Sequence, residues 1–160
     1  MTAPDVRPVV LAYDGSAESQ AALREAVALF GQRPLIVASV WEPGLAMATM
    51  MPPAGEPGMG YLPDPNEVAA IDRLESGHAG DVAQAGARLA REMGATAEAL
   101  SVPDSANVAA TLIAIAEERD ARAIVVGSRG LGGIKARVLG STSRKLLHDA
   151  HRPVLVVRTP

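Results

Sequence analysis

Residues 126–143 read V-G-S-R-G-L-G-G-I-K-A-R-V-L-G-S-T-S, and the organisation of the whole chain can be worked out from this segment. The apolar run at residues 123–126 indicates a buried parallel strand, and the apolar pair at 146–147 indicates one turn of a helix. A glycine-rich loop therefore leaves the carboxyl end of a strand and ends at the start of a helix. In open α/β sheets, ligands bind at that kind of position.

The composition of this loop favours an anion. Glycines let backbone N–H groups approach a ligand with no Cβ in the way, and the free N–H groups of a helix start attract negative charge. Hydroxyl groups at residues 141–143 add donors, and basic residues are more concentrated here than elsewhere. The loop glycines are Gly127, Gly130, Gly132 and Gly133, and the basic residues are Arg129, Lys135, Arg137, Arg144 and Lys145. These features predict a phosphate cradle, with Arg144 and Lys145 outside it on the helix.

The spacing of the glycines is more specific than the composition. Two residues separate Gly127 from Gly130, and nine more precede Gly140 and Ser141. This is neither the P-loop pattern nor G-x-G-x-x-G. It resembles, without a gap, the signature G-x2-G-x9-G-[ST] of the ATP-binding branch of the universal stress protein family.

The resemblance extends over the whole chain apart from a variable middle. Residues 9–16, V-V-L-A-Y-D-G-S, are similar to the first strand and D-G-S turn of that family, and residues 152–157, R-P-V-L-V-V, to its last strand. The resemblance implies a single domain over residues 1–160. It also implies a Rossmann-like α/β fold, with a five-stranded parallel open sheet of order 3-2-1-4-5.

The pattern of the chain leads independently to an α/β fold, because strand-like apolar runs alternate with segments of helical periodicity. Strands are predicted at residues 8–13, 34–41, 95–102, 122–126 and 153–157. Helices are predicted at residues 17–30 with a cap at Ser16, from a cap at Asp64 to about Met93, from a cap at Asp104 or Ser105 to near Arg119, and at residues 141–149. Strands and helices in this order require an all-parallel sheet with helices on both faces.

The helix that begins after Asp64 carries its larger apolar residues at intervals of three or four positions. These positions, with one histidine among them, are Val68, Ile71, Leu74, His78, Val82, Ala85, Leu89 and Met93. We expect this face to pack against the protein. His78 is expected to be an ordinary helical residue, because no other metal-ligand type flanks it.

Residues 43–65 differ from the rest of the chain. Ten of these 23 positions are Gly or Pro, and four of the six methionines lie here. Neither the strand period nor the helix period is present, so a long loop is predicted. Three interpretations stay open: a disordered insert that partly folds onto the protein, a lid over the nucleotide, or a partner-binding surface made adaptable by methionine.

Length and composition limit the possible functions. The 160 residues fit one domain, and a net charge of −3 argues against general nucleic-acid binding. There are no cysteines, and the three histidines lack partners at metal-site spacings, so no metal site is predicted. No basic leader and no apolar run long enough to cross a membrane is present. We therefore expect a soluble cytoplasmic protein.

Residues outside the loop complete the predicted site. Asp14 follows the first strand, where its carboxylate could accept hydrogen bonds from a ribose or an adenine amino group. A turn residue that bonds its own backbone is the equally plausible alternative, and the resemblance favours the ligand role. The resemblance also implies that main-chain groups of Val40 contact the adenine edge, with Ala12 and Val126 lining the slot for the base.

The predicted nucleotide site therefore consists of Ala12, Asp14, Val40, Val126, Gly127, Arg129, Gly130, Gly140, Ser141, Thr142 and Ser143. The ligand implied by the resemblance is ATP. Mg2+ or Mn2+ could be carried on its phosphates without protein ligands. No catalytic residue is assigned, because no P-loop lysine and no second acidic residue must converge on the phosphates.

A binding module of the stress response is the first functional hypothesis, in which the nucleotide state changes the loop or a dimer and so an unidentified signalling partner. The second hypothesis is a slow ATPase or an autophosphorylating enzyme, with Ser128, Ser141 or Thr142 as acceptor. A third is a sensor of AMP or cyclic AMP. The apolar last strand, Val154–Val157, predicts a homodimer, because an exposed apolar edge strand invites pairing with another chain.

Overall fold

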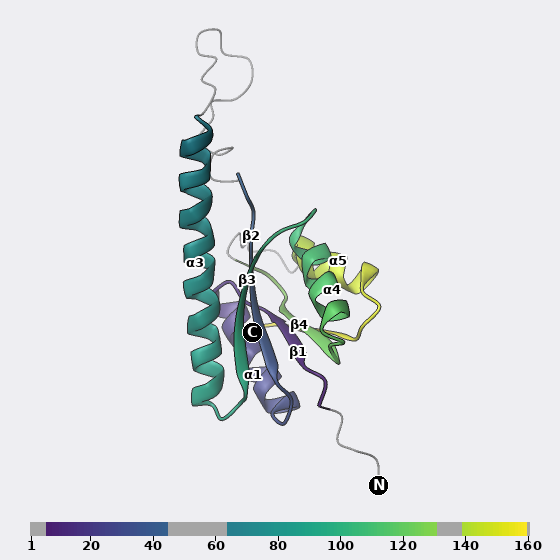
Figure 1. The fold of residues 1–160 in the computed structure, drawn as a ribbon. Helices are drawn as coiled ribbons and strands as arrows, with labels where there is room; N and C mark the ends of the chain where they lie inside the picture. Colours follow the sequence, from purple (N-terminus) through teal and green to yellow (C-terminus); the bar gives the residue numbers. More distant parts are fainter. Residues whose placement is uncertain (1–5, 45–63, 131–138, 160) are drawn as a thin grey trace.

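The structure is a computed structural model that describes residues 6–44, 64–130 and 139–159. Strands and helices alternate along these residues (Figure 1). In chain order they are β1 (Val9–Ala12), α1 (Ala17–Phe30), β2 (Leu35–Trp41), α3 (Pro65–Glu92), β3 (Ala97–Pro103), α4 (Val108–Glu118), β4 (Ala123–Gly127), α5 (Ser141–Asp149) and β5 (Val154–Val157).

The strands form one parallel sheet in the order β3-β2-β1-β4-β5. This confirms the predicted fold class and strand order. In the register of the central strands, Val10 lies between Ile36 of β2 and Ile124 of β4. The chain proceeds outward from β1 in one direction and then returns to place β4 on its other side. The ends of β1 and β4 therefore flank the topological switch point, where α/β sheets bind ligands.

Both faces of the sheet are buried, because successive strand residues point to opposite sides. Val9 and Leu11 pack on the face covered by α1 and α3, and Val10 packs on the face covered by α4 and α5. Figure 1 shows α3 on one side of the sheet and α4 with α5 on the other. This two-sided burial explains why the strands are continuous apolar runs rather than alternating ones.

The caps of the first two helices are as predicted. The Ser16 hydroxyl accepts a hydrogen bond from the Ser19 N–H at 3.2 Å, and the Asp64 carboxylate accepts one from the Asn66 N–H at 2.8 Å. Each bond satisfies an N–H that has no partner within its own helix.

The predicted cap of α4, Asp104 or Ser105, is wrong. The N–H of Asp104 donates to the carbonyl of Trp41 at 2.8 Å, so the chain is still bonded to β2 at that point. Asn107 caps the helix instead, and its side chain accepts from the Ala110 N–H at 3.1 Å.

The predicted packing face of α3 is also wrong in part. Leu74 is 74% exposed and Met93 is 41% exposed, and Ala85 is exposed as well. The residues that are buried are small, namely Ala79, Ala83, Gly86, Ala87 and Ala90.

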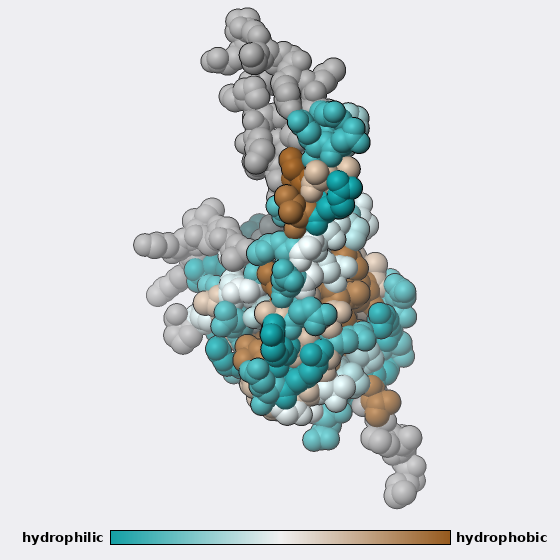
Figure 2. Space-filling view, turned by 60° about the vertical axis from the view of Figure 1, so that its left-hand side comes forward, coloured by the Kyte–Doolittle hydropathy of each residue, from teal (hydrophilic) through white to brown (hydrophobic). Residues whose placement is uncertain are grey.

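Small residues bring α3 close to the sheet. A Cβ at position 86 would lie 2.8 Å from the ring of Tyr13 and 2.9 Å from Val37. The amino-terminal part of α3 extends past the sheet (Figure 1), and Leu74 is exposed to solvent. Apolar surface is visible on this projecting part in Figure 2.

Some predictions fall on residues outside the described ranges. Most of the 43–65 segment and the loop cations Lys135 and Arg137 are among them. The start of that segment is described: the N–H of Gly44 donates to the Asp72 carboxylate at 2.9 Å. This bond ties the end of β2 to α3.

Candidate functional site

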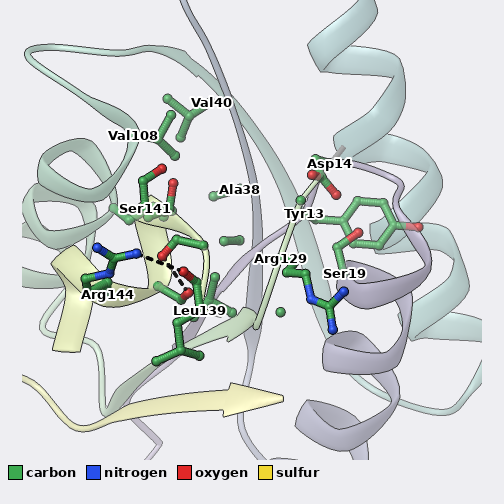
Figure 3. Close-up of a pocket in the computed structure, with 18 of the residues that line it drawn as sticks. Tyr13, Asp14, Ser19, Ala38, Val40, Val108, Arg129, Leu139, Ser141 and Arg144 are labelled. Carbon is green, nitrogen blue, oxygen red and sulfur yellow. Dashed lines mark hydrogen bonds between the residues drawn. The ribbon is translucent and has the colours of Figure 1, made fainter. Parts of the chain in front are cut away.

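A cavity of about 720 Å³ opens at the carboxyl ends of β1, β2 and β4. Its volume lies within the range of about 300–1,000 Å³ that is typical of small-molecule sites. The structure brings all eleven predicted site residues together around it (Figure 3). The other lining residues were not predicted from the sequence; they are Tyr13, Ser19, Ala38, Glu42, Val108, Leu112, Leu139 and Arg144.

One wall of the cavity is an apolar slot. Ala12, Val40 and Val126 point to the sheet face that α4 covers, and Val108 and Leu112 approach them from α4. Figure 3 shows the side chains of Val40 and Val108 together at this wall. A slot between a sheet and a helix suits a flat aromatic ring. The spacing of the two α4 residues, one helical turn apart, was the signal that could have identified them.

Asp14 makes the turn contact predicted as one alternative, and it also lines the cavity. Its Oδ1 accepts a hydrogen bond from the Ser16 N–H at 3.0 Å, which stabilises the turn through Gly15, whose φ is +79°. Its Oδ2 faces Gly130, where an added Cβ would lie 2.7 Å away. The carboxylate therefore shapes the turn and also stands at the cavity, and the loop can approach it closely because residue 130 is a glycine.

Tyr13 precedes Asp14 and is 7% exposed. Burial raises the pKa of its phenol, the negative charge of Asp14 raises it further, and Arg24 acts in the opposite direction. The phenol is therefore neutral at physiological pH. Its ring packs under α3 at Gly86, so Tyr13 links the floor of the cavity to that helix.

The packing of α1 against β4 requires a glycine at position 127, in addition to any role that this glycine has in ligand binding. A Cβ at this position would lie 2.9 Å from the Cβ of Glu18 and 3.0 Å from its carbonyl carbon. Helix α1 can therefore lie against the end of β4 only when residue 127 has no side chain. The sequence pattern could not separate this role from phosphate binding.

The start of α5 is held open at the cavity. Its N-cap, Gly140, provides no side-chain cap, and its own N–H donates to the Ser128 carbonyl at 2.8 Å. The first N–H groups of the helix are thus left for an external acceptor. The Ser143 hydroxyl is buried and donates to the carbonyls of Gly140 at 3.1 Å and Ser128 at 3.3 Å, so it holds the loop.

The residues named as possible phosphate acceptors differ in accessibility. Ser128 is 4% exposed, whereas Ser141 is exposed and Thr142 is half-buried. Ser141 and Thr142 line the cavity and Ser128 does not. The two accessible hydroxyls thus stand beside the open helix start.

Two arginines line the cavity. Arg129 is half-buried in the loop after β4, and Arg144 belongs to the first turn of α5. Arg144 was expected to lie outside the phosphate cradle, and this is wrong because Arg144 lines the cavity. Helical side chains point back toward the amino terminus of their helix, which here faces the cavity. The Nη2 of Arg144 donates to the Leu139 carbonyl at 3.2 Å. Lys145, by contrast, lies within 3.7 Å of Asp149 on the outer side of α5.

Within the described ranges, no group of three or more His, Asp or Glu side chains is arranged to hold a metal ion. None of the helices in the same ranges is both long and apolar enough to span a membrane.

Comparison with known proteins shows that the chain belongs to the universal stress protein family. A family model described as "Universal stress protein family" matches residues 104–158. A universal stress protein of Mycolicibacterium smegmatis is 33% identical over 158 residues, which cover 93% of this chain and 47% of that protein. One of Bacillus subtilis is 49% identical over 43 residues, covering 27% of this chain and 29% of that protein. The matched part thus spans less than half the length of each of these curated relatives.

Solved structures share the fold over nearly the whole chain. Universal stress protein UspA of Lactobacillus plantarum superposes with a TM-score of 0.73 at 19% identity, covering 96% of this chain and 98% of that one. The universal stress protein of Archaeoglobus fulgidus in complex with dAMP gives 0.59 at 24% identity, with coverages of 93% and 95%. A universal stress protein in complex with cAMP gives 0.59 at 24% identity, with coverages of 97% and 98%.

Proposed function

We propose that residues 1–160 form a single universal stress protein domain that binds ATP and acts as a nucleotide-dependent module in a stress response or in signalling. One observation carries the proposal: a single cavity joins an apolar slot to the open start of α5. An adenine nucleotide has the matching parts, an aromatic base and an anionic tail.

The base would enter the slot between β2 and α4. Val40 and Val108 provide its two sides, and main-chain groups of Val40 would meet the polar edge of the ring. Asp14 lines the same cavity beside Gly130, so its carboxylate would accept hydrogen bonds from ribose hydroxyls. Its bond to the Ser16 N–H orients the carboxylate before any ligand arrives.

The phosphates would lie at the start of α5. Ser141 and Thr142 offer backbone N–H groups and hydroxyls at the cavity. The helix dipole favours an anion at this end. We assign the buried Ser143 to holding the loop rather than to the ligand, since its hydroxyl already donates to two carbonyls.

The relatives support an adenine nucleotide as the ligand class, because two similar structures contain dAMP and cAMP. Our choice of ATP within that class follows from the glycine spacing. Mg2+ or Mn2+ would be carried on the phosphates. A cytoplasmic site of action fits such a ligand, and the bound nucleotide would control an as yet unidentified signalling partner.

The test is a calorimetric titration with ATP, with and without Mg2+, of protein shown to be free of retained nucleotide. The diagnostic variant is Ser141→Asp. A carboxylate in the first turn of α5 favours the helix but repels phosphate, so we expect ATP affinity to fall by at least about 30-fold with no loss of thermal stability. The matched control is Ala69→Asp, which adds the same charge to an exposed position near the start of α3.

The outcomes separate clearly. Saturable binding to the wild type and to the Ala69 variant, with loss in the Ser141 variant, supports the proposal. Equal binding by all three proteins would place the phosphates elsewhere. Failure of the wild type to bind ATP, AMP or cyclic AMP would refute it. Release of phosphate at more than a trace rate would favour the enzyme alternative instead.

We also propose that the chain forms a homodimer through β5. This strand is an edge of the sheet, and Val154, Leu155 and Val156 are only partly buried. Apolar edge strands invite pairing. Val156→Lys should therefore give a monomer mass by light scattering, whereas Leu100→Lys on the opposite edge strand should leave the dimer intact. A dimer mass for both variants would exclude the β5 interface.

A further inference from the structure

The two arginines at the cavity have no acidic partner in the part of the chain that the structure describes. Neither Arg129 nor Arg144 forms an ion pair with any residue in the described ranges. Arginines elsewhere do, for example Arg119 with Glu98 at 3.0 Å and Arg152 with Asp120 at 2.9 Å. The cavity therefore carries two positive charges that are available to an anion.

The two arginines lie on different sides of the end of β4. Figure 3 shows Arg129 extending toward α1 and Ser19, whereas Arg144 lies beside Leu139. Helix α1 and helix α5, which carries Arg144, cover opposite faces of the sheet. Arg129 is part of the tight loop, but Arg144 is an exposed side chain held by one hydrogen bond to a carbonyl.

The guanidinium of Arg144 reaches past the start of its own helix. Leu139 lies before the N-cap, so the bond from Nη2 to its carbonyl places the charge beyond the first N–H groups of α5. A guanidinium has five N–H donors, and one of them meets Leu139. The others can form the forked pair of bonds with a phosphate that lysine cannot form.

We propose that Arg144 is a specificity-determining residue that makes the cavity prefer a nucleoside di- or triphosphate over the monophosphate. The inference rests on the proposed function. The phosphate next to the ribose accepts hydrogen bonds from backbone N–H groups of α5 and the loop. Every nucleotide has this phosphate, so these bonds do not distinguish ATP from AMP. A second or third phosphate extends beyond the helix start, where it meets the Arg144 guanidinium.

A purely structural role predicts a different result. If Arg144 only holds the Leu139 carbonyl and so fixes the junction between loop and helix, its loss disturbs the backbone site that all adenine nucleotides share. Affinities for ATP, ADP and AMP would then fall by the same factor. The ratio of affinities, rather than any single affinity, is therefore the informative quantity.

The experiment is a calorimetric titration of wild type, Arg144→Gln and Arg144→Lys with ATP, ADP and AMP at one ionic strength. Lys145→Gln is the control, because it removes the same charge from the adjacent exposed residue. We expect Arg144→Gln to weaken ATP by about tenfold or more and AMP by less than about threefold. Arg144→Lys should lie between, and Lys145→Gln should leave the ratio unchanged.

Each outcome decides the question. A selective loss for ATP and ADP in the Arg144 variants alone supports the proposal. An equal loss for all three nucleotides, no loss, or the same change in Lys145→Gln overturns it while leaving the nucleotide site in place. A wild type that takes up no adenine nucleotide overturns this inference together with the proposed function, and the wild-type titration alone reveals that case.

Discussion

The two ends of the sheet use arginine in opposite ways. At the amino end, Oδ1 of Asp120 lies 2.9 Å from Nη1 of Arg152 and 4.0 Å from Nη1 of Arg7. Glu98 forms an ion pair with Arg119 at the same end. At the carboxyl end, the two arginines that line the cavity have no acidic partner among the described residues. The two ends therefore differ in whether their arginines are paired, and the end with unpaired arginines at a cavity is where we propose that the anionic ligand binds.

Backbone bonds follow the same division. Before the strands begin, the Arg122 N–H donates to the Pro8 carbonyl at 2.7 Å and the Val9 N–H donates to the Pro34 carbonyl at 2.9 Å, so neighbouring chains are tied directly. After the strands end, α5 begins at a glycine without a side-chain cap. The amino end is thus closed by protein groups, and the carboxyl end keeps donors for a ligand.

The largest effect should come from Gly127→Val, because a side chain there meets the backbone of Glu18 and forces α1 off β4. We expect the free energy of unfolding to fall by about 3 kcal/mol in a urea titration. Gly140→Ala is the control. Gly140 has φ −60°, and a Cβ there would lie 3.3 Å from the Ser128 carbonyl oxygen, so the cost should stay below about 1 kcal/mol. Equal stability of the two variants would show that the Gly127 contact does not matter.

Much of this architecture could be predicted from the sequence. Two-sided burial turns strands into apolar runs, and a buried strand followed by glycines and hydroxyls can be recognised without tertiary information. The helices at residues 17–30 and 141–149 agree with α1 and α5 for that reason. The glycine spacing likewise selected residues that meet at one cavity.

The remaining features depend on contacts between distant segments. The start of α4 is delayed by a bond from Asp104 to Trp41, 63 residues earlier in the chain, which no local propensity encodes. The packing face of α3 follows from how closely Gly86 approaches Tyr13, and counting large apolar residues favours the wrong side. The direction of Arg144 depends on an acceptor, Leu139, that only the folded loop presents.

A smaller effect is expected at the amino end. Asp120 has φ +47°, a conformation that asparagine tolerates far better than alanine. Asp120→Ala should lower the free energy of unfolding by about 1.5 kcal/mol, since it loses two exposed ion pairs and strains the backbone. Asp120→Asn loses only the ion pairs and should cost about 0.5 kcal/mol. Both can be measured by urea denaturation.

The Asp120→Asn variant also tests whether an arginine released from an ion pair creates a ligand site on its own. It removes the acidic partner of Arg152, and Arg152 does not line the cavity described above. ATP affinity should therefore stay within about twofold of the wild type. Additional ATP bound per chain in this variant would contradict the distinction between the two ends.

The smallest effect concerns pH and the floor of the cavity. Burial, assisted by Asp14, raises the pKa of Tyr13 above its usual value of 10.0. The neutral phenol is therefore favoured in the folded state, and the stabilisation it brings is complete below that value. As pH rises through the folded pKa, the unfolded chain ionises first, and the stabilisation is lost.

Tyr13→Phe keeps the ring under α3 but has no proton to lose. Thermal melts from about pH 8 to about pH 11 should show a smaller alkaline loss of stability for this variant than for the wild type, with similar stability near pH 8. Parallel curves for the two proteins would mean that the phenol is solvated in the folded state and that the cavity floor is open to water.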